Sequence, residues 1–315
     1  MGARLFLKRI GVMVIAAAMI GVSAGPAAAY TFTRTLQEGD KGPDVRALQV
    51  RVAGWYPQNG QEEMGIDGTF GPSTKAAVKA FQAFYGLEPD GVAGPTTFVV
   101  IDGLEDDDGS TLHFDWIEFK QKSNSNCSAK ANAYAGTFKG GMVAPRKARK
   151  NVRRIMWRLE AMRARAGGKS IAINSGFRSS TYNDCIGGAG SSQHMYGTAA
   201  DNRMAEVTNR YERDLARSSQ FHGIGCYSSL SHNHFDIRIE NKDNPSARFW
   251  WWPRQDGKGR DLASDGKPCF GEATAEKTPS RTTSSTGLSA AMILPSQRLL
   301  ADFATAPEWY QGLGD

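Results

Sequence analysis

The segments Ser191-Ser-Gln-His-Met-Tyr-Gly-Thr-Ala-Ala-Asp201 and Ser231-His-Asn-His-Phe-Asp-Ile-Arg238 decide how the second half of this chain folds. They hold three of the five histidines of the chain and one carboxylate each. Neutral imidazole and carboxylate are ligands that zinc accepts, and a catalytic zinc typically keeps about three protein ligands and one open position for water. The candidate ligands, one more than such a site needs, are His194, Asp201, His232 and His234.

The spacing within the second segment predicts a strand, because side chains two residues apart in a strand share a face. One face would carry His232, His234, Asp236 and Arg238, and the other Phe235, Ile237 and Ile239. Both imidazoles therefore point the same way, and the spacing does not decide which of them is the ligand. A strand without a metal would show the same alternation, but it would not account for the first segment, which is rich in Gly and small residues. His113 and His222 have no such partners, and we expect them to be ordinary core or surface residues.

Residues 1–29 predict a secretory signal peptide, with cleavage before Tyr30. Arg4, Lys8 and Arg9 precede an apolar run at 10–22, which is shorter than the ~20 residues of a spanning helix. We therefore expect a secreted protein with no membrane span after cleavage. Loss of this leader lowers the formal net charge from +6 to +3. Such a mildly basic chain suits an anionic cell surface and does not call for a nucleic-acid partner.

The four cysteines are widely spaced and form no C-x-x-C pair, so in an exported chain they predict two disulfides. Three connectivities are open. Cys127 and Cys185 flank the strand that precedes Arg178, whereas Cys226 and Cys269 bracket the strand that follows Ser231. We therefore predict the pairs Cys127–Cys185 and Cys226–Cys269.

The length of the chain favours about two domains. An acidic, Gly-containing break divides a cysteine-free front part, residues 30–103, from residues 113–271, and we interpret residues 104–112 as a linker. Residues 272–315 are rich in Ala, Thr and Ser at their start and predict a low-complexity tail. Residues 145–166 predict a strongly basic amphipathic helix, with Gly167 following its end. Its apolar positions are Val152, Ile155, Met156, Leu159 and Met162.

The front part contains an internal repeat, because Asp67-Gly-Thr-Phe-Gly-Pro-Ser-Thr74 recurs as Asp90-Gly-Val-Ala-Gly-Pro-Thr-Thr97. Each copy predicts a turn whose Ser or Thr caps the helix that follows. Together with Leu36-Gln-Glu-Gly-Asp-Lys-Gly-Pro-Asp-Val-Arg-Ala-Leu-Gln49 and Ala77-Val-Lys-Ala-Phe-Gln82, these motifs closely resemble the peptidoglycan-binding domain of many wall hydrolases, over about residues 34–102. The resemblance implies a small three-helix module that binds peptidoglycan, without indicating which residues contact the wall.

A third motif, Ser175-Gly-Phe-Arg-Ser179, presents an arginine at the end of a predicted strand. A planar guanidinium holds carboxylates well. This motif, the pattern Ser192-x-His194-x-x-Gly197-x-Ala199-x-Asp201 and the pair His232-x-His234 together resemble the zinc D-Ala-D-Ala carboxypeptidases of secreted actinomycete type, which have the hedgehog/DD-peptidase fold. The resemblance covers roughly residues 120–271 and implies an α+β peptidase domain with an antiparallel sheet.

The resemblance also implies the roles of individual residues. The zinc ligands would be His194, Asp201 and His234, and they would hold one ion. The catalytic residue would be His232, acting as a base or as a stabiliser of the oxyanion, and both alternatives stay open. Arg178 would contact the substrate near the scissile bond or at its terminal carboxylate, with Ser192 as a hydrogen-bonding neighbour.

We therefore expect a monomeric wall enzyme that removes the terminal D-Ala of peptidoglycan stem peptides. Two alternatives remain at this point. One is an endopeptidase of the same fold, and the other is a non-catalytic protein that binds the wall.

Overall fold

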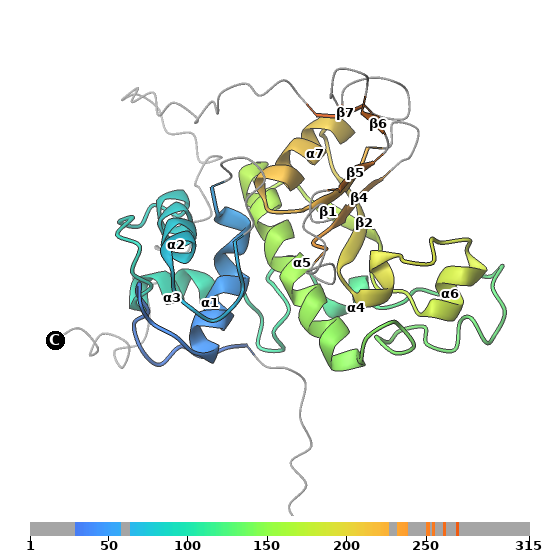
Figure 1. Ribbon diagram of the computed structural model, residues 1–315, viewed down its shortest axis with the longest axis horizontal. Coiled ribbons are helices and arrows are strands. Elements are labelled where there is room, and N and C mark those ends of the chain that lie inside the picture. Colours follow the sequence, from blue (N-terminus) through green and yellow to red (C-terminus); the bar gives the residue numbers. More distant parts are fainter. Residues whose placement is uncertain are drawn as a thin grey trace, which may run out of the picture.

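The computed structural model describes residues 29–57, 64–226 and 232–238, with the short pieces 250–252, 254–255, 261–262 and 269–270. The predicted leader, apart from its last residue, and the predicted tail lie outside these residues. Figure 1 shows a helical front module beside a larger domain that contains a sheet, with the long helix α5 (Pro145–Arg165) between them. Within the described ranges, no helix combines the length and the apolar character that crossing a bilayer requires.

In the residues that the structure describes, the front module has three α-helices and one short 3₁₀ turn, as the resemblance implied. The elements are α1 (Pro43–Val52), η1 (Ala53–Trp55), α2 (Pro72–Phe84) and α3 (Pro95–Asp102). Each α-helix begins with a proline that follows a glycine, which suits the first turn because proline has no N–H to leave unpaired there. The apolar faces of these helices meet around the buried side chains of Leu48, Trp55, Val78 and Phe81.

The internal repeat of the sequence is also a repeat of structure, held by two glutamines. The amide nitrogen of Gln49 donates to Asp67, Thr69 and Thr74, and that of Gln82 donates to Asp90, Val92 and Thr97. The expected helix caps were wrong, because Gly71 and Gly94 occupy the cap positions and make no side-chain cap. Thr74 and Thr97 lie inside the first turn instead, where each is buried and bonded to its glutamine.

The predicted linker is a folded segment. Leu104 and Thr111 are buried, and Glu105 pairs with Thr111 in an isolated β-bridge. The carboxylate of Glu105 forms an ion pair with Arg51 of α1, and both side chains are almost inaccessible to solvent. This buried pair holds the acidic segment against the front module.

The larger domain is the expected α+β domain. Its helical elements are α4 (Trp116–Phe119), α5, α6 (Ser180–Cys185), η2 (Gln193–Tyr196) and α7 (Asn209–Ser218). The main sheet has the order β1-β2-β4-β3-β5, with β1 at Ile171–Ser175, β2 at Ala199–Met204, β3 at Gly223–Gly225, β4 at Asn233–Asp236 and β5 at Trp250–Trp252. Strands β1 to β4 pair antiparallel, whereas β3 and β5 pair parallel. A small second sheet joins β6 (Arg254–Gln255) to β7 (Asp261–Leu262).

The two faces of the main sheet differ in character. One face packs on α5 and α7, and its buried apolar side chains include Ile171, Ile173, Met204 and Phe235. Because side chains alternate along a strand, Asp201, Arg203 and His234 belong to the other face. The helices therefore build the core on one side and leave the opposite side for polar groups.

Helix α5 is shared by the two domains. Its side chains at Val152, Ile155 and Leu159 belong to the core of the larger domain, whereas Trp157 and Ala161 belong to the core of the front module. The contact is close at Gly54, because a Cβ there would lie 2.7 Å from the Cβ of Ala161. The guanidinium of Arg165 donates to the Gly54 carbonyl oxygen at 2.6 Å and to Ser219 Oγ at 3.0 Å. The two domains therefore share one packed helix.

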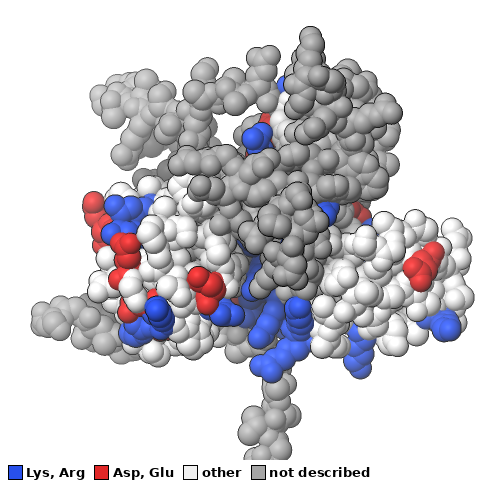
Figure 2. Space-filling model, in the orientation of Figure 1, with Lys and Arg blue, Asp and Glu red and all other residues white. Residues whose placement is uncertain are grey.

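The basic character of α5 is concentrated at its N-terminal half. Figure 2 shows Lys and Arg side chains gathered in the lower middle of the molecule, where this end of α5 lies. Arg146, Lys147 and Lys150 are exposed, and Arg149 lies over the ring of Trp116, with its guanidinium 4.2 Å from the ring centroid. Part of this charge therefore covers an aromatic side chain.

Two disulfides are present, with the pairing expected from the sequence. Cys127 is joined to Cys185, with the Cα atoms 5.8 Å apart, and Cys226 to Cys269, with the Cα atoms 5.4 Å apart. The first fastens the loop before α5 to the end of α6, and the second fastens the residue after β3 to a distant part of the chain. Both distances are typical of disulfides.

Candidate metal centre

The structure brings together His194, Asp201 and His234, one residue each from η2, β2 and β4. His194 Nε2 lies 3.2 Å from Asp201 Oδ1 and 3.2 Å from His234 Nδ1, and the latter two atoms are 2.9 Å apart. Ligand atoms about 2.0–2.2 Å from a tetrahedral zinc lie roughly 3.3–3.6 Å from one another. The three atoms therefore form a triangle close to the size that zinc needs, and their chemistry fits that metal.

His194 is held in the neutral form and the tautomer that a metal requires. Its Nδ1 lies 2.6 Å from the carbonyl oxygen of Gly176, so Nδ1 carries the proton and the lone pair of Nε2 faces the other two ligands. Burial lowers the pKa of this imidazole. The backbone turns away after η2 at Gly197, whose φ of 70° lies in the left-handed region. A Cβ at Gly197 would also lie 2.7 Å from the carbonyl oxygen of Ala148, so only glycine fits this position.

Asp201 faces both histidines through one oxygen and Arg178 through the other. It pairs with His234 across β2 and β4, which sets their side chains next to each other. Its Oδ2 accepts a hydrogen bond from Arg178 Nη2 at 2.5 Å. Burial would raise the pKa of this carboxyl, but His194 and His234 beside it hold the pKa well below its usual range. Asp201 is therefore ionised, as a metal ligand must be.

Asp236 contacts His234 at the ring nitrogen that faces away from the other two ligands. Its Oδ2 lies 3.2 Å from His234 Nε2 and 3.1 Å from Arg238 Nη2, and its side chain is fully buried. Burial would lower the pKa of His234, but the hydrogen bonds with Asp201 and Asp236 raise it to about 9. Nε2 is thus the donor toward Asp236, and Nδ1 is left for the metal.

Room for this carboxylate comes from Gly223 on β3. A Cβ at that position would lie 2.1 Å from Asp236 Oδ2, so any larger residue would displace the carboxylate. The sequence placed Asp236 on the face of the two histidines but assigned it no role. Its position two residues after His234 was the only signal available.

The remaining predicted site residues lie around this centre. Arg178 is anchored at two points, because its Nε also donates to Ser175 Oγ at 2.9 Å. Ser192 stands at the start of η2, where its carbonyl oxygen accepts a hydrogen bond from the Met195 N–H. His232 lies one residue before β4 and is half-buried, outside the cluster of three ligand atoms.

The two histidines that the sequence set aside make structural contacts. His113 Nδ1 lies 2.9 Å from Glu160 Oε2 on α5, and His222 is buried beside the backbone of β4, with Nδ1 3.4 Å from the carbonyl oxygen of Ile237. Neither belongs to the group of potential ligands found among the described residues.

Comparison with protein families gives one match in the front module and one in the larger domain. Residues 128–236 match the family described as Peptidase M15, and residues 41–101 match the putative peptidoglycan binding domain. Among curated proteins, the chain is 49% identical over 172 residues to the zinc D-Ala-D-Ala carboxypeptidase of Streptomyces albus G. That match covers 55% of this chain and 62% of the relative, so the chain spans less than two thirds of its length.

Two further relatives match shorter parts. An uncharacterized protein in the bpoA1 3' region of Kitasatospora aureofaciens is 37% identical over 108 residues, which are 30% of this chain and 89% of that protein. The N-acetylmuramoyl-L-alanine amidase CwlL of Bacillus licheniformis is 46% identical over 59 residues, which are 18% of this chain and 16% of that enzyme.

Proposed function

We propose that this chain, in which residues 128–236 match the peptidase M15 family, is a zinc D-Ala-D-Ala carboxypeptidase that removes the terminal D-Ala of peptidoglycan stem peptides. The observation that carries the proposal is the triangle of His194 Nε2, Asp201 Oδ1 and His234 Nδ1, in which hydrogen bonds from outside the triangle orient both imidazoles. These three residues would hold one zinc ion. Three protein ligands leave one position open, whereas a structural zinc is usually closed by four.

When bound, zinc would act as a Lewis acid toward the peptide carbonyl and would supply a water whose pKa is close to neutrality. The surrounding residues of the chain would position the substrate and stabilise the charge that develops on it. His232 is proposed to transfer a proton or to stabilise the oxyanion, because it precedes the ligand His234 by two residues, directly before β4. Arg178 is proposed to meet the substrate near the scissile bond, which agrees with its contact to a ligand carboxylate. Ser192 is proposed as a hydrogen-bonding neighbour of the substrate.

Peptidoglycan is the proposed partner of the front module. The match of residues 41–101 supports this role, as does the likeness of part of the chain to a wall amidase. The predicted leader supports export and action at the cell wall, and we propose that the mature protein acts as a monomer without a membrane span.

Product analysis on defined peptides tests the proposed activity. The zinc-loaded protein is incubated with a stem peptide that ends in D-Ala-D-Ala, and with the same peptide amidated at its C-terminus. Release of free D-Ala from the first peptide only, lost on chelation and restored by zinc, is the expected result. Equal cleavage of both peptides would indicate an endopeptidase, and binding to peptidoglycan without cleavage of either would indicate a non-catalytic wall protein.

A further inference from the structure

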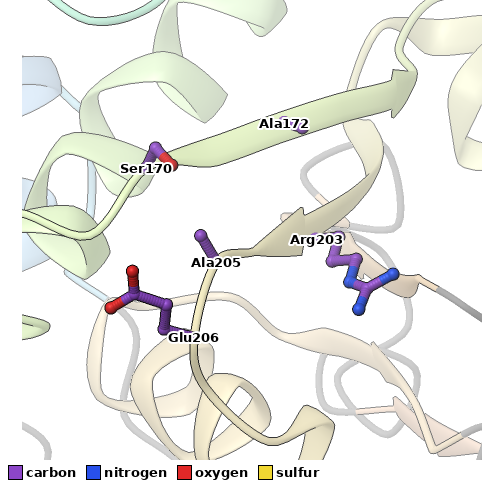
Figure 3. A pocket seen from close by; sticks show the side chains of 5 residues that line it. All are labelled: Ser170, Ala172, Arg203, Ala205 and Glu206. Atoms are coloured by element: carbon purple, nitrogen blue, oxygen red, sulfur yellow. The ribbon is translucent and has the colours of Figure 1, made fainter.

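A shallow, open cavity lies on the surface of the main sheet along β1 and β2. It is lined by Ser170, Ala172, Arg203, Ala205 and Glu206, and Figure 3 shows the two charged side chains extending in different directions from β2 and the residues after it. The other three lining residues have small side chains and leave space between the two charged groups.

This cavity and the metal centre share one face of the sheet. Arg203 follows Asp201 by two residues on β2, so their side chains point the same way. Ala172 pairs directly with Arg203 across β1 and β2. The intervening Asn202 is buried under the helices of the opposite face, whereas Arg203 is exposed. Two residues of a strand span about 7 Å, which is therefore the distance along β2 from Asp201 to Arg203.

Arg203 and the proposed catalytic histidine lie just beyond the same end of the β2–β4 ladder. The ladder ends with the pair Asn202 and Asn233, and the residues that follow it on the two segments are Arg203 and His232. A substrate that reaches His232 would therefore pass the end of the ladder at which the Arg203 side chain lies.

Of the charged groups at this cavity, the Arg203 guanidinium can bind an anionic ligand. Glu206 is paired with Lys169 at its rim, so these two charges offset each other. Among the residues that the structure describes, the guanidinium of Arg203 forms no hydrogen bond or ion pair. Arg178, by contrast, is held by Asp201 and Ser175. A free, planar guanidinium is the group that best binds a carboxylate through two hydrogen bonds.

We propose that Arg203 and this cavity form a subsite that binds a carboxylate of the peptide substrate beside the metal centre. The proposal rests on the proposed function and adds a specificity residue to it. Because Arg203 lies only two residues from Asp201 along β2, the carboxylate is either the free C-terminus or an acidic side chain close to the scissile bond.

Binding of a non-cleavable peptide tests the subsite. Zinc-loaded full-length protein is titrated with a stem peptide in which a reduced amide replaces the scissile bond, and the variants are Arg203→Ala and Arg203→Lys. The matched control is Arg210→Ala, which removes an exposed arginine from α7 on the opposite side of the sheet. A hydrogen-bonded charge pair is worth about 1.5–3 kcal/mol, so Arg203→Ala should weaken binding by about tenfold or more. Arg203→Lys should restore part of this loss, and Arg210→Ala should leave affinity unchanged.

Two further peptides identify the source of the carboxylate. If the subsite binds the C-terminus, amidation of the peptide abolishes the difference between wild type and Arg203→Ala. If it binds an acidic side chain, replacement of that side chain by its amide does so instead. Equal affinity of Arg203→Ala and Arg210→Ala for every peptide would overturn the subsite. Absence of cleavage with Arg203-dependent binding intact would refute the proposed activity and leave the subsite standing.

Discussion

Replacement of Asp236 by Asn should weaken zinc binding by an amount that grows with pH. The change keeps the shape of the side chain and removes the negative charge that lies 3.2 Å from His234 Nε2. Loss of a partner behind a ligating histidine typically lowers metal affinity by about 10- to 100-fold, or about 1.4–2.7 kcal/mol. This is the loss expected at a pH above 9, where the pKa of His234 no longer matters.

At lower pH a second effect opposes the first. Because the pKa of His234 is raised to about 9, a proton competes with zinc for this imidazole at pH 7. Competition of this size weakens apparent zinc affinity by about tenfold for each pH unit below the pKa. Asp236 is one cause of the raised pKa, so Asp236→Asn lowers it and relieves part of the competition. The loss of affinity should therefore be smaller at pH 6.5 than at pH 9.5.

Competition with a chromophoric chelator measures both affinities. The control is Asp184→Asn, which removes an exposed carboxylate on α6, and thermal unfolding of the metal-free variants checks that Asp236→Asn is folded. Unchanged affinity at pH 9.5 would refute the supporting role of Asp236. A loss that shrinks as pH rises would refute the account of proton competition.

Four further predictions concern His232, His234 and the packing at Gly54. His232→Ala should keep its zinc, measured by metal analysis, and lose about 10²- to 10⁴-fold in turnover; loss of the metal would make His232 a ligand instead. Zinc binding at pH 7 should release about one proton from His234, measured by calorimetry in buffers of different ionisation enthalpy. Because its pKa is raised in the folded state, His234 stabilises the metal-free protein fully below about pH 6.5, and this stability should be lost as pH rises to about 9. Gly54→Leu should lower the free energy of unfolding by about 1–3 kcal/mol, whereas Gly190→Leu, in open space, should not; equal melting temperatures would contradict the close packing at α5.

The sequence predicted the architecture where one local pattern decides the outcome. Alternation around His234 indicated the strand, and helical spacing indicated the face of α5 that carries Ile155 and Leu159. The second contact face of α5, with Trp157 and Ala161, was not predictable, because it depends on a separate module that includes Gly54, more than a hundred residues earlier in the chain. A helix that packs on two sides shows only its stronger apolar stripe in a periodic pattern.

At the candidate metal centre, too, local motifs were predictive and contacts between separate elements were not. The motifs indicated which residues gather there, but not that Arg178 would be held by Asp201, since these residues are on separate elements. In the segment after Asp102, composition alone predicts a linker, whereas the structure shows a folded segment. It has the acidic character of a linker, and a single buried partner, Arg51, is enough to fold Glu105 into the structure.

The sharing of α5 has a consequence for how the protein would work on an insoluble substrate. A flexible tether lets a catalytic domain search a volume, and the effective concentration of its target depends on tether length. A module that is packed on the same helix as the peptidase domain has no such freedom. The distance between the wall-binding module and the metal centre is then constant. In the proposed function, only those stem peptides that lie at this distance from the binding site of the module would reach the metal centre. Turnover on intact wall would therefore depend on how regularly the stem peptides are spaced along the peptidoglycan. Turnover on free peptides would not.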